Sequence, residues 1–231
     1  MSLDTSVPTH VGLILDGNRR WARAQGMPTL EGHRKGYENL KTIAEAAFDR
    51  GVGYVSAFVF STENWNRDKE EVDYLMNLLN WVVKNEVKDM HKKGVRVLWL
   101  GSRTHMNAGL VKDIEAAEKL TKDNTKGTLA LCLNHGGHRE IAEAVQRIVL
   151  AGEKPEDIDE KLIASYIDYP DLPPVDLIVR TSGEQRLSNF MLWRAAYSEL
   201  IFRDEPWPDF TVESLDECLL EYSQRQRRFG G

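Results

Sequence analysis

The segment from Asp16 to Gly36 concentrates positive charge directly behind a short apolar run. It holds five basic residues against two acidic ones, although the whole chain carries a formal net charge of −6. Arginine side chains and exposed backbone amides suit the binding of phosphate and diphosphate. The segment therefore predicts a site for a phosphate-bearing ligand, which local charge attracts against the overall charge of the chain.

Asp16 is the acidic residue that follows the apolar run Gly12–Leu15 and precedes the basic cluster. Magnesium in phosphate-handling sites is commonly bound by one or two carboxylates together with substrate phosphate oxygens. Asp16 is therefore the candidate magnesium ligand. Gly17, Gly32 and Gly36 are expected to let backbone N–H groups approach the anion closely, with helix N-termini behind them.

Polar loops follow three further segments that are predicted to be strands. These loops are STENWNR (61–67), NHGGHRE (134–140) and TSGEQRLSN (181–189). In a parallel sheet, the carboxyl ends of the strands share one edge, and ligands gather there. We therefore expect these loops and Asp16 to form one active site.

Short apolar runs and helical periodicity predict how these loops are positioned. The predicted strands are Gly12–Leu15, Tyr54–Phe60, Arg96–Leu100, Thr128–Leu133, Asp176–Arg180 and Leu200–Phe202. The predicted helices are His33–Arg50, Asp68–Lys93, 105–122, 138–151, 159–167 and 212–228. This alternation indicates one α/β domain over residues 1–231, with a mainly parallel six-stranded sheet flanked by helices. The wide apolar face of the second helix either packs on the sheet or lines an apolar cavity or a subunit interface.

The composition is that of an ordinary globular protein, with 42% apolar and 29% charged residues among 231. The negative net charge argues against a general nucleic-acid surface. The first ten residues lack the basic and apolar regions of a signal peptide, and no apolar run is long enough to span a bilayer. We therefore expect a cytoplasmic protein in which Cys132 and Cys218 are reduced, buried thiols.

Six motifs occur in order from about residue 10 to 210: DGNRRWA, GHRKG, FSTENWNR, NHGGHREI, IVRTSGEQRLSNFMLW and YSELIF followed by WPDF. Together they resemble the cis-prenyltransferase family, typified by undecaprenyl diphosphate synthase. The resemblance implies Mg²⁺-dependent condensation of isopentenyl diphosphate onto an allylic diphosphate, commonly farnesyl diphosphate, with each new double bond cis. It also implies an apolar tunnel for the growing chain, a homodimer, and a product such as undecaprenyl diphosphate, the precursor of a cell-wall lipid carrier. Membrane association would be peripheral, through that product.

The resemblance also assigns roles to individual residues. Asp16 would be the central catalytic carboxylate and, with Glu199, a magnesium ligand, and Asn64 would be the proton acceptor. Residues 17–20 would form a loop around the allylic diphosphate. The residues near that diphosphate and its chain would be Gly17, Asn18, Arg19, Arg20, Trp21, His33, Trp65 and Arg67. The reacting centre would be lined by Ser61, Thr62 and Glu63, and isopentenyl diphosphate would be held by Arg180, Arg186, Leu187 and Ser188.

Two positions depart from the family pattern. Thr29 stands where a basic residue is frequent, which should weaken binding of the allylic diphosphate, and His135 stands where an aromatic residue is common. His135, His138 and Glu140 could alternatively form a metal cluster; the simpler interpretation is a helix start in which Glu140 favours the dipole. The terminal RQRRFGG resembles the family ending that reaches towards the partner subunit's site.

Two other functions are considered beside an active transferase. A non-catalytic partner subunit of a prenyltransferase would be expected to lose motif residues, and this chain keeps them. A phosphoester hydrolase could also place an aspartate after its first strand, but it usually has a second acid two positions on, where this chain has Asn18. Product length depends on the depth of the tunnel. Val59 is expected to border the tunnel and to shorten the product relative to a smaller residue.

Overall fold

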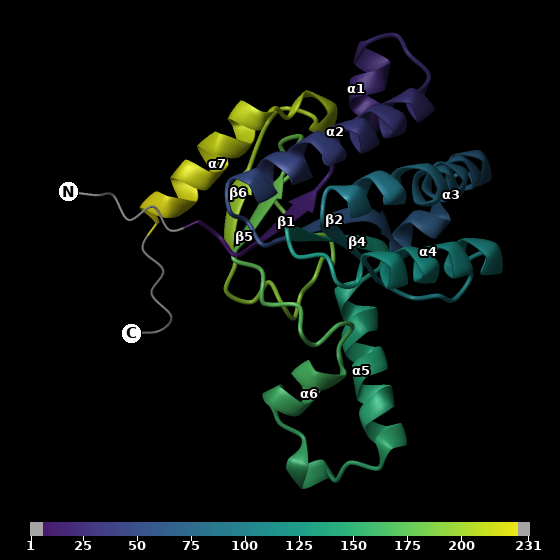
Figure 1. The fold of residues 1–231 in the computed structure, drawn as a ribbon, viewed down its shortest axis with the longest axis vertical. Helices are drawn as coiled ribbons and strands as arrows, with labels where there is room; N and C mark the ends of the chain where they lie inside the picture. The colour runs from purple at the N-terminus through teal and green to yellow at the C-terminus, as the bar shows by residue number, and fades with distance from the viewer. Residues whose placement is uncertain (1–6, 226–231) are drawn as a thin grey trace.

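Six parallel strands form the central sheet of the computed structural model, which describes residues 7–225 (Figure 1). The strands are β1 (His10–Ile14), β2 (Tyr54–Ser61), β3 (Val95–Leu100), β4 (Gly127–His135), β5 (Leu177–Arg180) and β6 (Glu199–Phe202). Their order across the sheet is β3-β4-β2-β1-β5-β6, and each paired neighbour is parallel. The predicted α/β class and six-stranded sheet are confirmed.

Helices connect the strands and flank the sheet. The α-helices are α1 (Asn18–Ala24), α2 (Thr29–Asp49), α3 (Lys69–Lys92), α4 (Ala108–Thr121), α5 (Gly137–Ala151), α6 (Glu160–Tyr166) and α7 (Val212–Gln224). Short 3₁₀ turns occupy Thr62–Asn66, Pro155–Asp157 and Trp207–Asp209. The six predicted helices are present with ends shifted by a few residues, and α1 is an addition.

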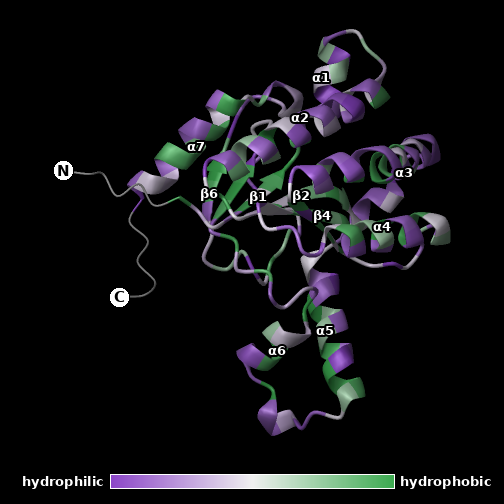
Figure 2. Cartoon of the chain, viewed as in Figure 1, coloured by the Kyte–Doolittle hydropathy of each residue, from purple (hydrophilic) through white to green (hydrophobic). Residues whose placement is uncertain are grey.

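Apolar side chains cover both faces of the sheet, as expected for parallel strands that are buried on each side. One face packs against α2 and α7, through residues such as Ile43 and Leu215. The opposite face packs against the segment 172–195, in which Phe190 and Met191 are fully buried. Figure 2 shows hydrophobic residues gathered in the central strands, whereas the helices carry both kinds.

Residues 17–20 do not form the predicted loop, because helix α1 begins at Asn18. Gly17 is the N-cap of this helix with φ of 101°, and a Cβ there would lie 2.6 Å from a side-chain oxygen, so the position requires glycine. Gly32 and Gly36 lie inside α2, where their missing side chains make room for Asn18. The prediction that these two glycines expose amides to an anion is wrong; they let α1 pack closely on α2.

β1 lies inside the sheet, between β2 and β5. The register aligns Leu13 of β1 with Ala57 of β2 and Val179 of β5, so the three strands end at one edge. The chain leaves β1 towards β2 on one side and returns on the other side at β5. Such a reversal opens a crevice at the carboxyl ends of the strands. The fold therefore brings the segments after β1, β2 and β5 to one place.

Glu140 lies in the first turn of α5, as predicted, but it is fully buried. Its Oε1 accepts a hydrogen bond of 2.8 Å from Nη1 of Arg194, which is also buried. Arg194 donates further bonds to the carbonyls of Asp168 and Tyr169. A buried pair of this kind is costly to break from one side, because the remaining charge has no counter-charge and no water.

Replacing Arg194 by methionine is expected to destabilise the fold by about 3–5 kcal/mol, since it leaves the Glu140 carboxylate buried and unpaired. Adding Glu140→Leu removes both charges and should recover most of that loss. Urea unfolding of the wild type, the single variant and the double variant measures both effects. A double variant that is no more stable than the single variant would contradict this account.

Both cysteines, Cys132 and Cys218, are free and buried, as predicted. Burial raises the pKa of the Cys218 thiol to about 12, which keeps it protonated at neutral pH. No helix within residues 7–225 is long and apolar enough to cross a bilayer.

Candidate active site

Asp16, Arg180 and Ser188 are joined by direct contacts at the carboxyl edge of the sheet. Arg180 Nη2 donates to Asp16 Oδ2 at 2.9 Å, and Arg180 Nη1 donates to Ser188 Oγ at 2.8 Å. Arg180 is only 4% exposed, so its guanidinium forms the base of the site. Asp16 Oδ1 also accepts the N–H of Gly17 at 2.7 Å. The ends of β1 and β5 therefore meet at one carboxylate, as the sequence predicts.

Arg20 places a second guanidinium beside this carboxylate. Its Nη2 lies 3.4 Å from Asp16 Oδ1, and its Nη1 lies 3.6 Å from Glu184 Oε1. Arg186 pairs with Glu184 as well, from an exposed position. Glu184 thus links Arg20 of α1 with Arg186 of the loop after β5, a role that was not predicted from the sequence. Leu187 packs with an apolar cluster on the sheet and is not among the residues that line the cavity described below.

The loop after β5 holds several non-glycine residues in the left-handed backbone region, namely Ser182, Ser188, Asn189 and Met191. Such conformations cost free energy and persist where the surroundings fix them. Asn189 provides part of that fixation, because its Oδ1 accepts the His138 N–H at 2.8 Å and its Nδ2 donates to Glu63 at 3.0 Å. Asn189 was not predicted as a site residue; its position at the end of a polar loop is the only signal in the sequence.

Ser61 and Asn64 line the cavity from the end of β2. Asn64 Oδ1 accepts the Ser61 N–H at 3.1 Å, and the Ser61 side chain accepts the Asn64 N–H, which forms a capping box. Thr62 and Glu63 contact the loops after β4 and β5 instead, with Thr62 beside Gly136. Of the residues predicted around the reacting centre, Ser61 and Asn64 therefore reach the cavity directly.

A buried carboxylate on α3, Glu71, gathers three groups that are predicted to bind the allylic diphosphate. Its Oε1 accepts from His33 Nε2 at 3.0 Å and from Arg67 Nη1 at 2.8 Å, and its Oε2 lies 3.2 Å from Arg19 Nη1. Burial acts to raise the pKa of Glu71, but Arg67, His33 and Arg19 outweigh it and lower the pKa, so the carboxylate is ionised. Burial lowers the pKa of His33, so its imidazole is neutral at pH 7 and donates through Nε2–H.

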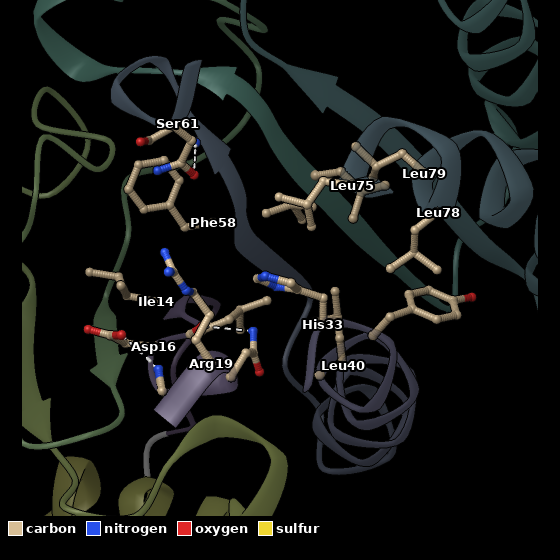
Figure 3. A pocket seen from close by; sticks show the side chains of 18 of the residues that line it. Ile14, Asp16, Arg19, His33, Leu40, Phe58, Ser61, Leu75, Leu78 and Leu79 are labelled. Atoms are coloured by element: carbon tan, nitrogen blue, oxygen red, sulfur yellow. Dashed lines mark hydrogen bonds between the residues drawn. The ribbon is translucent and has the colours of Figure 1, made fainter. Parts of the chain in front are cut away.

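A cavity of about 430 Å³ runs from this polar edge into the space between α2, α3 and the sheet (Figure 3). The predicted site residues that line it are Asp16, Gly17, Asn18, Arg19, Arg20, His33, Ser61, Asn64, Arg67, Arg180 and Ser188. Its apolar part is lined by residues that include Leu40, Leu75, Leu78, Leu79, Val82, Leu129 and Leu131. Val59 also lines the cavity, as predicted. The apolar face of α3 both lines the cavity and packs in the core.

Neither Trp21 nor Trp65 lines this cavity, contrary to the prediction. Trp21 Nε1 donates to Asp209 Oδ1 at 2.6 Å. Trp65 Nε1 donates to Asn134 Oδ1 at 2.8 Å, and its ring packs edge-on against Phe60. Each indole N–H is thus satisfied by a residue that does not line the cavity.

Glu199 does not meet Asp16 within one chain, contrary to the predicted pair of magnesium ligands. It is the first residue of β6, in register with Leu177, which in turn pairs with Val11. Asp16 follows the carboxyl end of β1, whereas Glu199 is level with Val11 near the start of that strand. At about 3.3 Å per strand residue, the two carboxylates therefore lie at opposite ends of the strands. Glu199 Oε2 instead accepts from Arg225 Nη1 at 2.7 Å.

His135, His138 and Glu140 do not form a metal cluster. His135 Nε2 accepts the N–H of Met191 at 3.2 Å, and Glu140 is engaged by Arg194. Burial lowers the pKa of His135 to about 3, so the ring is neutral. In the part of the chain that the structure describes, no group of three or more His, Cys, Asp or Glu side chains is arranged to hold a metal ion.

A polar edge rich in arginine opens into an apolar cavity, which suits a ligand with an anionic head and a hydrocarbon chain. The Prenyltransf family model, described as putative undecaprenyl diphosphate synthase, matches residues 14–230. The chain belongs to this family. It is a cis-prenyltransferase, an enzyme that elongates prenyl chains, as the motifs in its sequence indicate.

Curated relatives and a solved structure are similar to this prenyltransferase along nearly its whole length. It is 46% identical to isoprenyl transferase 2 of Corynebacterium glutamicum, over 97% of this chain and 94% of the relative. It is 44% identical to the trans,polycis-polyprenyl diphosphate synthase ((2Z,6E)-farnesyl diphosphate specific) of Thermobifida fusca, over 97% and 81%. The crystal structure of lavandulyl diphosphate synthase from Lavandula x intermedia, in complex with dimethylallyl diphosphate, matches with a TM-score of 0.92 and 33% identity, over 97% and 99%. These similarities do not support the alternative function of a phosphoester hydrolase.

Proposed function

We propose that this prenyltransferase condenses isopentenyl diphosphate onto an allylic diphosphate, with farnesyl diphosphate as the primer, and releases a cis-polyprenyl diphosphate such as undecaprenyl diphosphate. One observation carries this proposal: Asp16, Arg180 and Ser188 join at the polar mouth of a cavity that also has a large apolar part. A diphosphate would bind at the mouth while its prenyl chain fills the apolar part. A non-catalytic partner subunit would not need this complete set of polar groups.

The allylic diphosphate would bind near the α1 end of the mouth, where Arg19, His33 and Arg67 converge on Glu71. The backbone of Gly17 and the side chains of Asn18 and Arg20 would complete that subsite, since these residues also line the cavity and belong to α1 or its N-cap. Isopentenyl diphosphate would bind at the end of β5, on Arg180 of that strand and on Arg186 and Ser188 of the loop after it.

Magnesium would be held at Asp16, whose carboxylate faces the cavity and is 30% exposed. Each of its oxygens accepts a hydrogen bond, from Gly17 and from Arg180, and a carboxylate has further lone pairs for a cation. A single carboxylate together with two substrate diphosphates is a donor set that suits Mg²⁺. When bound, the ion would offset negative charge on the diphosphates. We assign no metal role to Glu199.

The reaction needs charge stabilisation more than covalent catalysis. Breaking the allylic C–O bond leaves a carbocation and a free diphosphate, and the arginines at the mouth would stabilise that anion. Binding at Arg180 and Ser188 would hold the double bond of isopentenyl diphosphate beside the allylic carbon. The new C–C bond forms there, and a proton leaves the isopentenyl unit to restore a double bond. We propose that Asn64, on the cavity wall, accepts this proton.

Incubation with radiolabelled isopentenyl diphosphate, farnesyl diphosphate and Mg²⁺ should yield label that extracts into butanol. Chelation by EDTA should abolish the signal, and excess Mg²⁺ should restore it, because the ion screens the diphosphates. The absence of extractable label from folded protein would contradict the proposal. Activity that persists unchanged in EDTA would contradict the magnesium requirement alone.

Val59 is expected to limit the length of the product, because it lines the cavity into which the chain grows. Val59→Ala removes two methyl groups from this wall, so the product distribution should shift towards longer chains. Chromatography of dephosphorylated products against polyprenol standards measures the shift. A distribution identical to that of the wild type would show that Val59 does not control length.

We propose a homodimer that forms through α5 and α6, which extend away from the rest of the molecule (Figure 1). Val145, Val149 and Leu150 on α5 are 45%, 67% and 86% exposed, so this helix presents an apolar surface. A cytoplasmic location and peripheral membrane association through the product remain predictions. The terminal RQRRFGG, predicted to reach towards the partner, lies outside the described residues apart from Arg225.

A further inference from the structure

Glu71 stands out because it is an acidic residue behind the basic side chains at the mouth of the cavity. Its side chain is 9% exposed, and it neither lines the cavity nor carries any role assigned above. A buried carboxylate costs free energy unless it is paired, and here each of its oxygens has a basic partner. The contacts of Glu71 therefore identify what this carboxylate does.

Glu71 connects side chains that three separate segments supply. Arg19 comes from α1, His33 from α2, and Arg67 from the turn before α3. The three polar groups all lie within 3.2 Å of its two oxygens. Arg19 and Arg67 are 40% and 32% exposed, so without a shared partner their long side chains would sample many rotamers.

We propose that Glu71 is a positioning residue that holds Arg19, His33 and Arg67 in place for the allylic diphosphate. This inference rests on the proposed function, because it takes the α1 end of the mouth as the allylic subsite. Preorganised cations lose less entropy when the anion binds, which strengthens binding without a new contact. The carboxylate itself stays behind the cations and does not touch the substrate.

The charges of the cluster are consistent with this role. His33 is neutral at pH 7 because burial lowers its pKa, whereas Glu71 is ionised. The two guanidinium charges therefore exceed the single carboxylate charge, and the cluster stays net positive towards an anion. Glu71 fixes the geometry without cancelling the attraction.

A neighbouring residue, Glu70, provides a control that distinguishes the positioning role of Glu71 from a purely structural role in helix α3. Glu70 lies in the same first turn of α3 and shares its interaction with the helix dipole, but it is exposed. Glu70→Gln is therefore a matched control for Glu71→Gln. Glu71→Gln keeps the size and one acceptor oxygen but removes the charge, and Glu71→Asp restores the charge on a shorter side chain.

The test measures substrate binding and turnover in the full-length protein. Glu71→Gln should raise the KM for farnesyl diphosphate about 10-fold and leave the KM for isopentenyl diphosphate within about twofold, because only one subsite loses its preorganised cations. Glu70→Gln should change neither constant, and Glu71→Asp should recover part of the farnesyl diphosphate affinity. Calorimetry of farnesyl diphosphate binding, without the second substrate, gives an affinity that does not depend on turnover.

Two results would overturn the proposal. Unchanged or tighter farnesyl diphosphate binding by Glu71→Gln would show that the carboxylate does not prepare the site or competes with the anion. Equal losses for both substrates would indicate a general structural effect. A wild type that binds farnesyl diphosphate but makes no product would count against the proposed function instead, and leave the calorimetric comparison intact.

Discussion

Replacing Asp16 by alanine is expected to lower turnover by about 10³-fold or more, while the sheet stays folded. Asp16 is the carboxylate that Arg180 and Gly17 both contact, and it faces the cavity where both diphosphates would meet. Its loss removes the proposed magnesium ligand and frees Arg180 from one partner. Steady-state assays with both substrates measure the loss, and far-UV circular dichroism checks the fold.

Asp16→Asn removes the negative charge of the side chain but keeps its shape, so this variant tests the charge alone. The amide oxygen can still accept from Gly17 or Arg180, so this variant should fold like the wild type but share the defect in turnover. A variant that folds and keeps more than about a tenth of wild-type turnover would show that Asp16 does not have the role assigned here.

Arg180→Lys is expected to lower kcat/KM for isopentenyl diphosphate about 100-fold, and to affect farnesyl diphosphate binding less. Arg180 donates from one nitrogen to Asp16 and from another to Ser188 and the Arg186 carbonyl. A lysine ammonium is a single point and cannot span these acceptors in the same geometry. The defect should therefore appear although the positive charge is kept.

Arg203→Lys is a suitable control for this variant. Arg203 lies after β6, and its side chain pairs with Glu205 and Glu217, none of which lines the cavity. Its backbone N–H donates to the Arg180 carbonyl, a contact that a lysine in its place keeps. It should leave both substrate constants unchanged. Wild-type kcat/KM for isopentenyl diphosphate in Arg180→Lys would mean that charge alone suffices at this position, against the bridging role.

The sheet and its functional edge could be predicted from the sequence because both follow from short-range patterns. Apolar runs such as Tyr54–Phe60 mark buried strands, and alternation with helices makes the sheet parallel. The residues after each strand then share an edge, which is why Asp16 and Arg180 could be placed together. Helix α1 escaped prediction because seven residues are too few to show a periodic apolar face.

The less accurate predictions concern side chains whose partners are far apart in the sequence. Glu199 lies in one of the six motifs, but the motif does not show that it begins β6, at the amino-terminal end of the strands. Trp21 and Trp65 satisfy their indole groups through Asp209 and Asn134, which no local pattern reveals. Glu71 likewise has two partners, Arg19 and His33, that are distant in the sequence.

The configuration of the new double bonds tests the central claim most directly. Products made from radiolabelled isopentenyl diphosphate and farnesyl diphosphate would be dephosphorylated and compared by chromatography with cis-polyprenol and all-trans standards. We predict that the label elutes with the cis series and that Asp16→Asn, assayed in parallel, gives almost none. Label in the all-trans series, or no extractable label from folded wild-type protein, would contradict this account.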